Sequence, residues 1–319
     1  MNKGKKVTII GAGNVGASVA FALSSSGTAA EIVIVDINKD KAFGEALDIY
    51  QGTAMSVPVN VHAGDYPDTE GSDVVIVTSG APRKPGQSRI DLVQGNADIM
   101  NSIMPKVIKY CPNAVYIIVS NPVDVLTYQV ATRFGLSRTQ VIGTGTLLDS
   151  SRLRAVIAKL LGVNSHSVHG YVLGEHGDTS VIPWSLLTIG GVNIEAYSEN
   201  TVSDFKFDKI NKEEIEREVR MSGATVIKAK GATYYAISLA VKKLVEAILR
   251  DSNSVMVVSA ALDKTDGCYG ISDVALSLPY IIGARGIHGA MCPQLTVDEV
   301  KELLHSANTL KSVIENINF

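Results

Sequence analysis

A histidine between two glycines is the residue of this sequence best suited to proton transfer. It lies in the segment Gly174-Glu175-His176-Gly177-Asp178, directly after an apolar run at residues 168–173 that favours a strand. Imidazole changes its charge near neutral pH, so a histidine at a flexible strand end can act as a general acid or base. Taken alone, His176 is equally well explained as a structural residue.

A second segment offers a carboxylate and a guanidinium on one face of a helix. Residues 145–154 open a predicted helix in which Asp149 and Arg152 are three positions apart, a spacing that makes them neighbours. A carboxylate can orient an imidazole, and a guanidinium can bind a substrate carboxylate through two hydrogen bonds. The plain alternative is an ion pair on the helix surface.

A third segment, residues 81–89, is a loop with two prolines, one glycine and the cations Arg83, Lys84 and Arg89. It stands between a predicted strand and a predicted helix, as a hinged lid would. A cation in a closing lid can polarise a substrate carbonyl while water leaves the site. Judged on composition alone, it is better described as a solvated basic loop.

The N-terminal region carries a glycine motif that could hold a dinucleotide. Gly11-Ala12-Gly13-Asn14-Val15-Gly16 follows an apolar run at residues 7–10 and precedes a helical pattern. The first glycine of such a motif permits the turn, the second admits the pyrophosphate, and the third lets the helix pack on the strand. A second strand ends at Asp36, whose carboxylate would bind ribose hydroxyls and repel a 2′-phosphate. The pattern predicts NAD rather than NADP; a glycine-rich packing turn is the alternative.

Alternating apolar and amphipathic stretches predict the elements that would position these residues. Helix-length segments separate β-branched runs at 7–10, 31–36, 73–78 and 115–120, which is typical of a parallel sheet covered on both faces. After residue 145 the pattern favours helices at 148–161, 212–230, 234–249 and 297–316, and strands at 168–173 and 254–261. We expect an α/β fold: a doubly wound parallel Rossmann sheet in residues 1–145, then an α+β substrate and catalytic domain in residues 146–319.

Composition argues against several classes of protein. The 319 residues carry a net charge of only −3, so nucleic acid is not an expected partner. No apolar run approaches the roughly 18 residues of a membrane span, and no export signal is recognisable, so we expect a cytoplasmic protein with no membrane partner. Cys111, Cys268 and Cys292 are widely spaced, which indicates neither a disulfide nor a zinc site, and no metal is expected.

Several motifs in the same order carry a resemblance to a known family. Asp149-x-x-Arg152 followed by Gly-Glu-His-Gly-Asp resembles the paired catalytic signature of the lactate/malate dehydrogenase family. The similarity extends over essentially the whole chain, including the glycine loop, Ser120-Asn121-Pro122-Val123-Asp124 and residues 230–236. This resemblance implies an NAD-dependent oxidoreductase that interconverts a small L-2-hydroxy acid and its 2-keto acid.

The resemblance also implies a role for each site residue. His176 would exchange the proton, and Asp149 would hold and stabilise its imidazolium. Arg152 would grip the substrate carboxylate, and Arg89 would polarise the carbonyl. Asn121 would hydrogen-bond the substrate or the nicotinamide, and Ile237 would pack beside the nicotinamide ring. The other implied cofactor contacts are Gly11, Gly13, Asn14, Val15, Gly16, Asp36, Gly80, Asn96 and Ser120.

Two positions give opposite indications of the substrate. Arg83 matches the family's specificity position in the lid, where malate enzymes carry arginine and lactate enzymes carry glutamine. Thr233 is typical of lactate enzymes, and the rest of the chain resembles bacterial lactate dehydrogenases. An arginine facing a methyl group would stay desolvated and unpaired, and this charge effect exceeds the effect of a small change in volume. We therefore expect (S)-malate and oxaloacetate, with L-lactate and pyruvate as the alternative.

The same resemblance implies self-association, and we expect a homotetramer. Arg154 and His169 match positions at which bacterial lactate enzymes bind fructose 1,6-bisphosphate, so an allosteric anion site is one interpretation and a purely structural pair is the other. A non-catalytic NAD-binding module or a Rossmann-like methyltransferase would not need Asp149, Arg152 and His176 together. Their joint presence argues against both classes.

Overall fold

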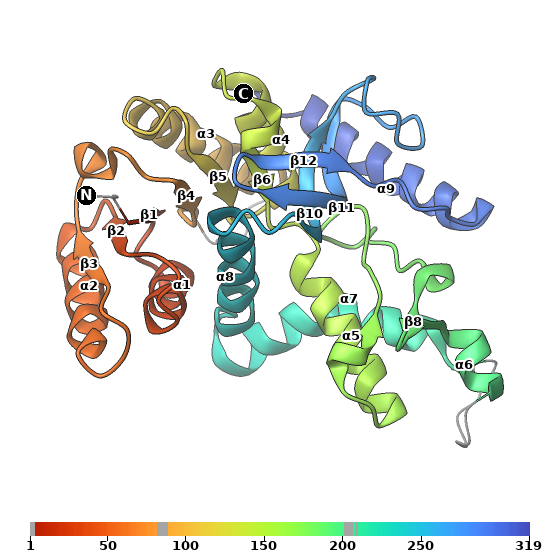
Figure 1. The fold of residues 1–319 in the computed structure, drawn as a ribbon. Helices are drawn as coiled ribbons and strands as arrows, with labels where there is room; N and C mark the ends of the chain where they lie inside the picture. Colours follow the sequence, from red (N-terminus) through yellow and green to blue (C-terminus); the bar gives the residue numbers. More distant parts are fainter. Residues whose placement is uncertain (1–3, 82–88, 201–206, 208–209) are drawn as a thin grey trace.

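A single nine-stranded sheet dominates the computed structural model, which describes residues 4–81, 89–200, 207 and 210–319 (Figure 1). Its strand order is β12-β11-β10-β6-β5-β4-β1-β2-β3, in which β1 to β6 are parallel and β10 to β12 are antiparallel. The strands are β1 Lys6–Ile10, β2 Glu31–Val35, β3 Asn60–Ala63, β4 Val74–Val77, β5 Val115–Ile118, β6 Val141–Gly143, β10 Ser254–Leu262, β11 Val274–Gly283 and β12 Gly286–Ala290.

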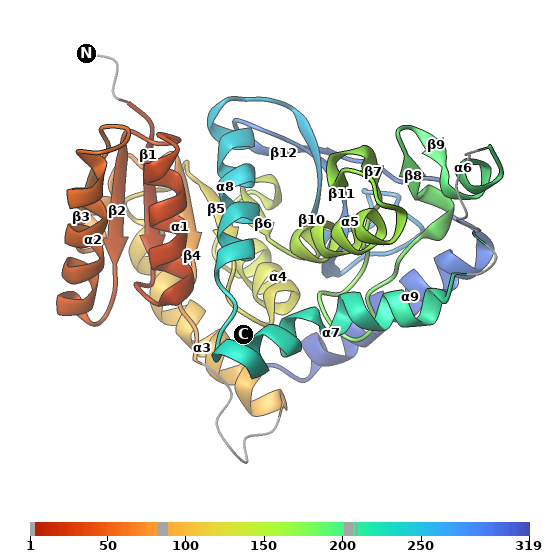
Figure 2. The same cartoon turned by 90° about the horizontal axis from the view of Figure 1, so that it is seen from below.

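Helices cover this sheet and, together with strands β7 to β12, make up the second half of the chain (Figures 1 and 2). Helix α8 lies beside α1, and α7 packs on α5. The α-helices are α1 Asn14–Ser25, α2 Lys39–Thr53, α3 Arg89–Ile108, α4 Val123–Arg133, α5 Leu147–Leu161, α6 Ile194–Asn200, α7 Lys212–Lys230, α8 Tyr235–Leu249 and α9 Val297–Glu315. Short 3-10 helices are η1 Tyr66–Thr69, η2 Arg138–Gln140, η3 Ser165–Ser167 and η4 Trp184–Leu186, and a small second sheet contains β7 Val168–His169, β8 Thr188–Ile189 and β9 Val192–Asn193.

The core forms because the parallel strands are apolar on both faces. Every residue of β4 and β5 is buried, as are the last four residues of β1 and β2. Helices on the two faces of a parallel sheet remove both sides from water, which selects such continuous apolar runs. A second apolar cluster gathers α5, the small sheet and α7 around Leu153, Trp184 and Val219. The predicted fold class is confirmed.

Several elements differ from the prediction. Strands β3 and β6 were not expected: β3 buries only one of its four residues, and β6 is three residues long. The strand predicted at 168–173 is wrong over most of its length, since β7 ends at His169 and Leu173 instead makes an isolated bridge to Val181. The antiparallel strands β11 and β12 were also missed. The boundary at residue 145 stays a prediction, and the sheet continues across it through the pairing of β6 with β10.

Among the described residues, no helix is both long enough and apolar enough to cross a membrane.

Candidate active site

His176, Asp149 and Arg152 form one connected group. The Nδ1 atom of His176 lies 2.5 Å from Oδ2 of Asp149. The other carboxylate oxygen of Asp149 accepts a hydrogen bond from Nη1 of Arg152 at 2.7 Å. The Asp149 side chain is only 9% exposed, whereas that of His176 is 30% exposed. A buried carboxylate therefore orients both a partly accessible imidazole and a guanidinium, which is not the surface ion pair that was the alternative.

The helix that carries Asp149 and Arg152 begins in a tightly packed turn. Gly145 precedes α5 with a φ of +46°, and a Cβ there would collide with the Ser277 hydroxyl. The same hydroxyl accepts a hydrogen bond from the N–H of Thr146 at 3.0 Å. A glycine is needed because the chain passes against β11 in a left-handed conformation. The first turn of α5 is thereby fixed on the sheet, below His176.

The charges of this group depend on one another. Burial disfavours the charged imidazole, but the hydrogen bond and charge of Asp149 outweigh it, so the pKa of His176 is raised. Burial likewise disfavours the carboxylate of Asp149, yet His176 and Arg152 hold its pKa below the ordinary value. Both shifts favour an imidazolium beside a carboxylate, and an imidazolium can donate a proton to an adjacent oxygen.

The loop that carries His176 is held by contacts that sequence reasoning missed. The backbone N–H of His176 donates to Oδ2 of Asp124 at 2.7 Å. Gly174, at φ +83°, exchanges two backbone hydrogen bonds with Ser277 on β11. Glu175 is buried, and its N–H donates to the hydroxyl of Ser306 on α9 at 2.8 Å. The only signal in the sequence was the acid in the motif that ends at Asp124, to which no role was given.

The glycine loop joins β1 to α1 as predicted. Gly11 has a φ of +114°, and a Cβ at Gly16 would collide with the carbonyl of Gly11. A Cβ at Gly13 would meet nothing within 4 Å, so this glycine faces open space. Asn14 and Val15 open α1, whose cap has no side-chain hydrogen bond. The loop thus fits the close approach of a pyrophosphate to backbone amides.

Asp36 directly follows the last residue of β2 and faces the same loop. Its Oδ2 accepts the N–H of Ala12 at 2.6 Å, and its Oδ1 accepts the N–H of Asn38 at 2.8 Å. The carboxylate is therefore fixed at the carboxyl edge of the sheet, where an adenosine ribose would lie.

Gly80, Asn96, Ser120 and Asn121 come together beyond β4 and β5. Asn96 is buried, and its side chain accepts the N–H of Ala81 at 2.8 Å and donates to the carbonyl of Asn121 at 2.8 Å. The Ser120 hydroxyl donates to the carbonyl of Ser79 at 2.6 Å. A Cβ on Gly80 would touch Asn96 and Ser120. In this arrangement Asn96 braces two loop backbones at the edge where a cofactor would bind.

The lid residues cannot be placed. Arg83 lies outside the described residues, and of Arg89 only its position at the start of α3 is described. Thr233 lies in the connection between α7 and α8, and Ile237 follows in the first turn of α8 and packs against the large core. Helix α7 approaches the catalytic group, since a Cβ on Gly223 would lie 3.5 Å from Nη2 of Arg152.

Arg154 contacts the backbone directly before His169, and the anion site at these two residues stays a prediction. Arg154 donates from Nε to the carbonyl of Val168 at 2.8 Å and from Nη2 to that of Ser165 at 3.2 Å, and His169 is exposed. No group of histidine, cysteine, aspartate and glutamate among the described residues is arranged to hold a metal ion.

The expectation about cysteines is wrong. Cys268 and Cys292 form a disulfide with a Cα–Cα distance of 5.5 Å, while Cys111 is free and buried. Cys268 lies between β10 and β11, and Cys292 follows β12. Strands β11 and β12, which the sequence did not predict, bring these distant positions together.

Comparison with known proteins gives matches along the entire chain. Residues 5–143 match the lactate/malate dehydrogenase NAD-binding domain, and residues 146–318 match the lactate/malate dehydrogenase alpha/beta C-terminal domain. L-lactate dehydrogenase 1 of Clostridium acetobutylicum is 47% identical over 99% of this chain and 100% of its own length. L-lactate dehydrogenase of Thermoanaerobacterium saccharolyticum is 46% identical over 98% of this chain and 99% of its own length.

Two solved structures have closely similar folds. A minor L-lactate dehydrogenase from Enterococcus mundtii, in a ligand-bound form, has a TM-score of 0.94 and 37% identity, with complete coverage of both chains. A lactate dehydrogenase from a Medee basin deep-sea metagenome library has a TM-score of 0.94 and 34% identity over 99% of this chain and 100% of its own.

These relatives overturn the expectation that malate and oxaloacetate are the substrates. All four are named lactate dehydrogenases. The error lay in giving Arg83 more weight than Thr233 and the rest of the chain. A buried, unpaired guanidinium would be costly, but an arginine in a lid loop avoids that cost if its head stays in water.

Proposed function

The chain belongs to the lactate/malate dehydrogenase family, uses NAD, and, we propose, interconverts L-lactate and pyruvate. The observation that carries this proposal is the identity of 41–47% over nearly the full length to proteins named L-lactate dehydrogenase. Thr233, typical of lactate enzymes, supports the same substrate.

The catalytic group supplies what pyruvate reduction needs from the protein. Arg152 binds the substrate carboxylate through the N–H donors that Asp149 does not occupy, which orients carbon 2. His176 donates its proton to the carbonyl oxygen, and Asp149 stabilises the imidazolium before the transfer. NADH, when bound, supplies the hydride to carbon 2. In lactate oxidation the same imidazole accepts the hydroxyl proton.

The lid completes the site in this proposal. Arg89 polarises the carbonyl on closure, and Asn121 hydrogen-bonds the substrate or the nicotinamide. Thr233 borders the substrate methyl group, and Arg83 is assigned no substrate contact because pyruvate has no second carboxylate. The roles of Arg89, Asn121 and Thr233 follow the family resemblance of the motifs.

The cofactor contacts follow the carboxyl edge of the sheet. The glycine loop would hold the pyrophosphate at the start of α1, and Asp36 would accept hydrogen bonds from the adenosine ribose. Gly80, Asn96 and Ser120 shape the wall along the nicotinamide half, and Ile237 packs beside the ring. The fixed backbone around Asn96 supports this placement.

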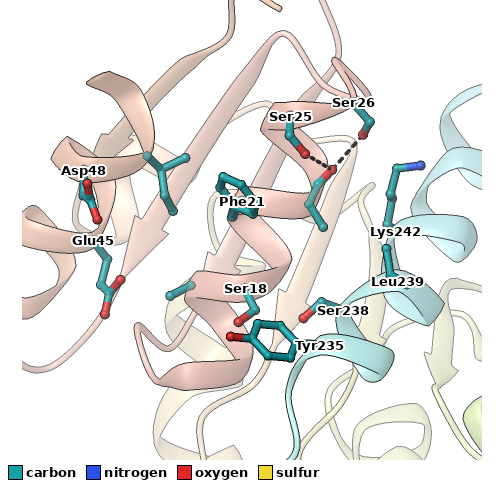
Figure 3. Close-up of a pocket in the computed structure, with 13 residues that line it drawn as sticks. Ser18, Phe21, Ser25, Ser26, Glu45, Asp48, Tyr235, Ser238, Leu239 and Lys242 are labelled. Carbon is teal, nitrogen blue, oxygen red and sulfur yellow. Dashed lines mark hydrogen bonds between the residues drawn. The ribbon is translucent and has the colours of Figure 1, made fainter. Parts of the chain in front are cut away.

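We also propose that the protein self-associates, as a homotetramer, with the face between α1, α2 and α8 in contact with another copy. This face holds a pocket of about 600 Å³ that is lined by Phe21 and Leu239, both more than 60% exposed, and by Tyr235 (Figure 3). Such a cluster of exposed apolar side chains is typical of an interface. Light scattering of the purified chain tests it: a monomer at micromolar concentration would exclude the proposal.

The cytoplasm is the proposed location, because the reaction draws on the cellular NAD pool. The disulfide is the observation against it, since such bonds rarely persist in a reducing compartment.

Product analysis tests the proposed reaction directly. The purified chain is incubated with pyruvate and NADH, and the lactate formed is assayed with enantiomer-specific methods, with NADPH as the control cofactor. We expect one L-lactate for each NADH oxidised and far slower turnover with NADPH because of Asp36. No lactate, or D-lactate, would refute the proposal.

A further inference from the structure

Asp124 connects two parts of the molecule that meet at the catalytic histidine. It lies in the first turn of α4, is 2% exposed, and accepts the backbone N–H of His176 at 2.7 Å. Asp124 falls within the segment that matches the NAD-binding domain, and His176 within the segment that matches the C-terminal domain. The hydrogen bond therefore ties the loop of the proton donor to the helix that follows Asn121.

The hydrogen bonding of this carboxyl is unusual for an acid at the start of a helix. An acid there ordinarily binds amides of its own helix or interacts with the helix dipole. No side-chain hydrogen bond caps α4. The hydrogen bond that Asp124 accepts comes from His176, which lies outside this helix. Its Oδ1 and the nearby Ser259 hydroxyl are both buried without completing a hydrogen bond to any described residue.

Stability alone is a weak reason to keep such a group. Burial raises the pKa of Asp124 to about 6, while the backbone N–H and the charge of His176 limit the increase. A buried carboxyl with one oxygen unpartnered is costly, and an apolar residue could fill the same volume. Among the described residues, the hydrogen bond that Asp124 completes is the one with the backbone of the catalytic residue.

The loop around His176 needs an external constraint. Gly174 and Gly177 flank the Glu175-His176 pair, and glycines allow a wide range of backbone angles. Asp149 holds the imidazole at Nδ1 but does not fix the backbone from which the ring projects. Displacement of a reacting group by about 1 Å can cost 100-fold in rate.

We infer that Asp124 is a positioning residue for the reaction proposed above. Its carboxyl fixes the backbone of His176 against α4, so that the imidazole keeps a constant position relative to the bound cofactor. The inference rests on the proposed function. Asp124 touches neither substrate nor cofactor in this account and acts only through His176.

Two substitutions separate the hydrogen bond from the charge. Asp124→Asn keeps an acceptor oxygen and the shape of the side chain, whereas Asp124→Ala removes the acceptor. Thr127→Val is the matched control, because Thr127 lies one turn later on α4, is fully buried, and uses its hydroxyl only within the helix, on the carbonyl of Val123 at 2.7 Å. It should cost stability comparably without touching His176.

Steady-state kinetics with pyruvate and NADH binding by fluorescence give the first readout. We expect Asp124→Ala to lose about 10- to 100-fold in kcat, with the Kd for NADH within about twofold of the wild type. Asp124→Asn should regain most of that kcat, and Thr127→Val should keep it. A folded Asp124→Ala variant with wild-type kcat would overturn the inference.

Titration of His176 by NMR gives a second readout that needs no substrate. The charged groups facing His176 are Asp149 and Arg152 of α5 and Asp124 of α4, with Glu175 facing Asp124 in turn. Loss of the Asp124 charge should lower the pKa of His176 in Asp124→Asn but not in Thr127→Val. The hydrogen bond itself is read from the His176 amide proton, which should exchange with solvent faster in Asp124→Ala than in Thr127→Val and stay protected in Asp124→Asn. Asp124→Leu takes the place of an alanine variant that does not fold, and exchange equal to that in Thr127→Val would overturn the inference. Failure of the wild type to reduce pyruvate would refute the proposed function and leave amide exchange to decide the role of Asp124.

Discussion

Oδ2 of Asp149 lies 2.5 Å from Nδ1 of His176, and Oδ1 of the same carboxylate accepts a hydrogen bond from Arg152. The proton donor and the proposed carboxylate clamp therefore share one buried anchor on the first turn of α5. Because the anchor is a single side chain, a change at Asp149 should alter both proton transfer and substrate orientation, whereas loss of the Arg152 charge should raise the pKa of His176 only slightly.

The first prediction concerns pH. Pyruvate reduction requires protonated His176, whose pKa is raised mainly because Asp149 outweighs the effect of burial. The kcat/KM for pyruvate should be level at low pH and fall as pH rises through that raised pKa, while kcat/KM for lactate should rise over the same range. Asp149→Asn should move both transitions to lower pH and reduce the plateau for pyruvate by about 100-fold or more.

Asp298→Asn is the control for this experiment, since Asp298 is exposed on α9 and, among the described residues, forms its ion pair with Lys301 in its own helix. Its pH profile should match the wild type. If the transitions of Asp149→Asn stayed at the wild-type pH, the proposed cause of the raised pKa would be wrong.

The second prediction concerns the carboxylate clamp. Arg152→Lys keeps the charge but loses the planar fork of donors, so it should cost about 1.5–3 kcal/mol of transition-state stabilisation, seen as a fall in kcat/KM for pyruvate. Arg220→Lys on α7, where the guanidinium pairs with Glu216 at 3.1 Å, is the control and should change little. Equal effects of the two substitutions would indicate that Arg152 has no special contact with the substrate.

The third prediction concerns the disulfide. Cys268 and Cys292 are 24 residues apart in sequence, and closing a loop of this size is worth about 3 kcal/mol by chain entropy. Cys292→Ser should therefore lower the Tm under oxidising conditions, and a reductant should remove the difference from the wild type. If Cys292→Ser and the wild type have the same Tm without reductant, the disulfide is absent from the protein as prepared.

The fourth prediction concerns the anion site at Arg154 and His169. If fructose 1,6-bisphosphate binds the native assembly there, millimolar ligand should raise the Tm, and Arg154→Gln should abolish the increase. Sulfate at matched ionic strength is the control ligand. No shift in the wild type would leave Arg154 with only its hydrogen bonds to the carbonyls of Val168 and Ser165.

Much of the fold was predictable because its signals are local. The apolar runs before Gly11 and Asp36 are strands, and the helix predicted at 212–230 has those bounds in the structure. Strands β3 and β6 lack such a signal because they are short. They are strands because they pair with β2 and β5, which are distant in sequence. The chain after His169 looked like a strand because it is apolar, but it crosses the core with only isolated bridges.

The site was predictable in its residues more than in its contacts. His176, Asp149 and Arg152 were found through their motifs, and the structure joins them. The role of Asp124 was hidden because its partner lies 52 residues away, and the disulfide depends on strands that the sequence did not predict. Specificity was misjudged because sequence does not say whether a lid arginine faces the substrate or the solvent.

The most direct test of the central claim is the ratio of kcat/KM for pyruvate and oxaloacetate, measured side by side with NADH on the purified chain. We predict a clear preference for pyruvate, as expected from the lactate dehydrogenase relatives and from Thr233 beside the methyl group. A preference for oxaloacetate would contradict the proposed function and would mean that Arg83 pairs with a second substrate carboxylate.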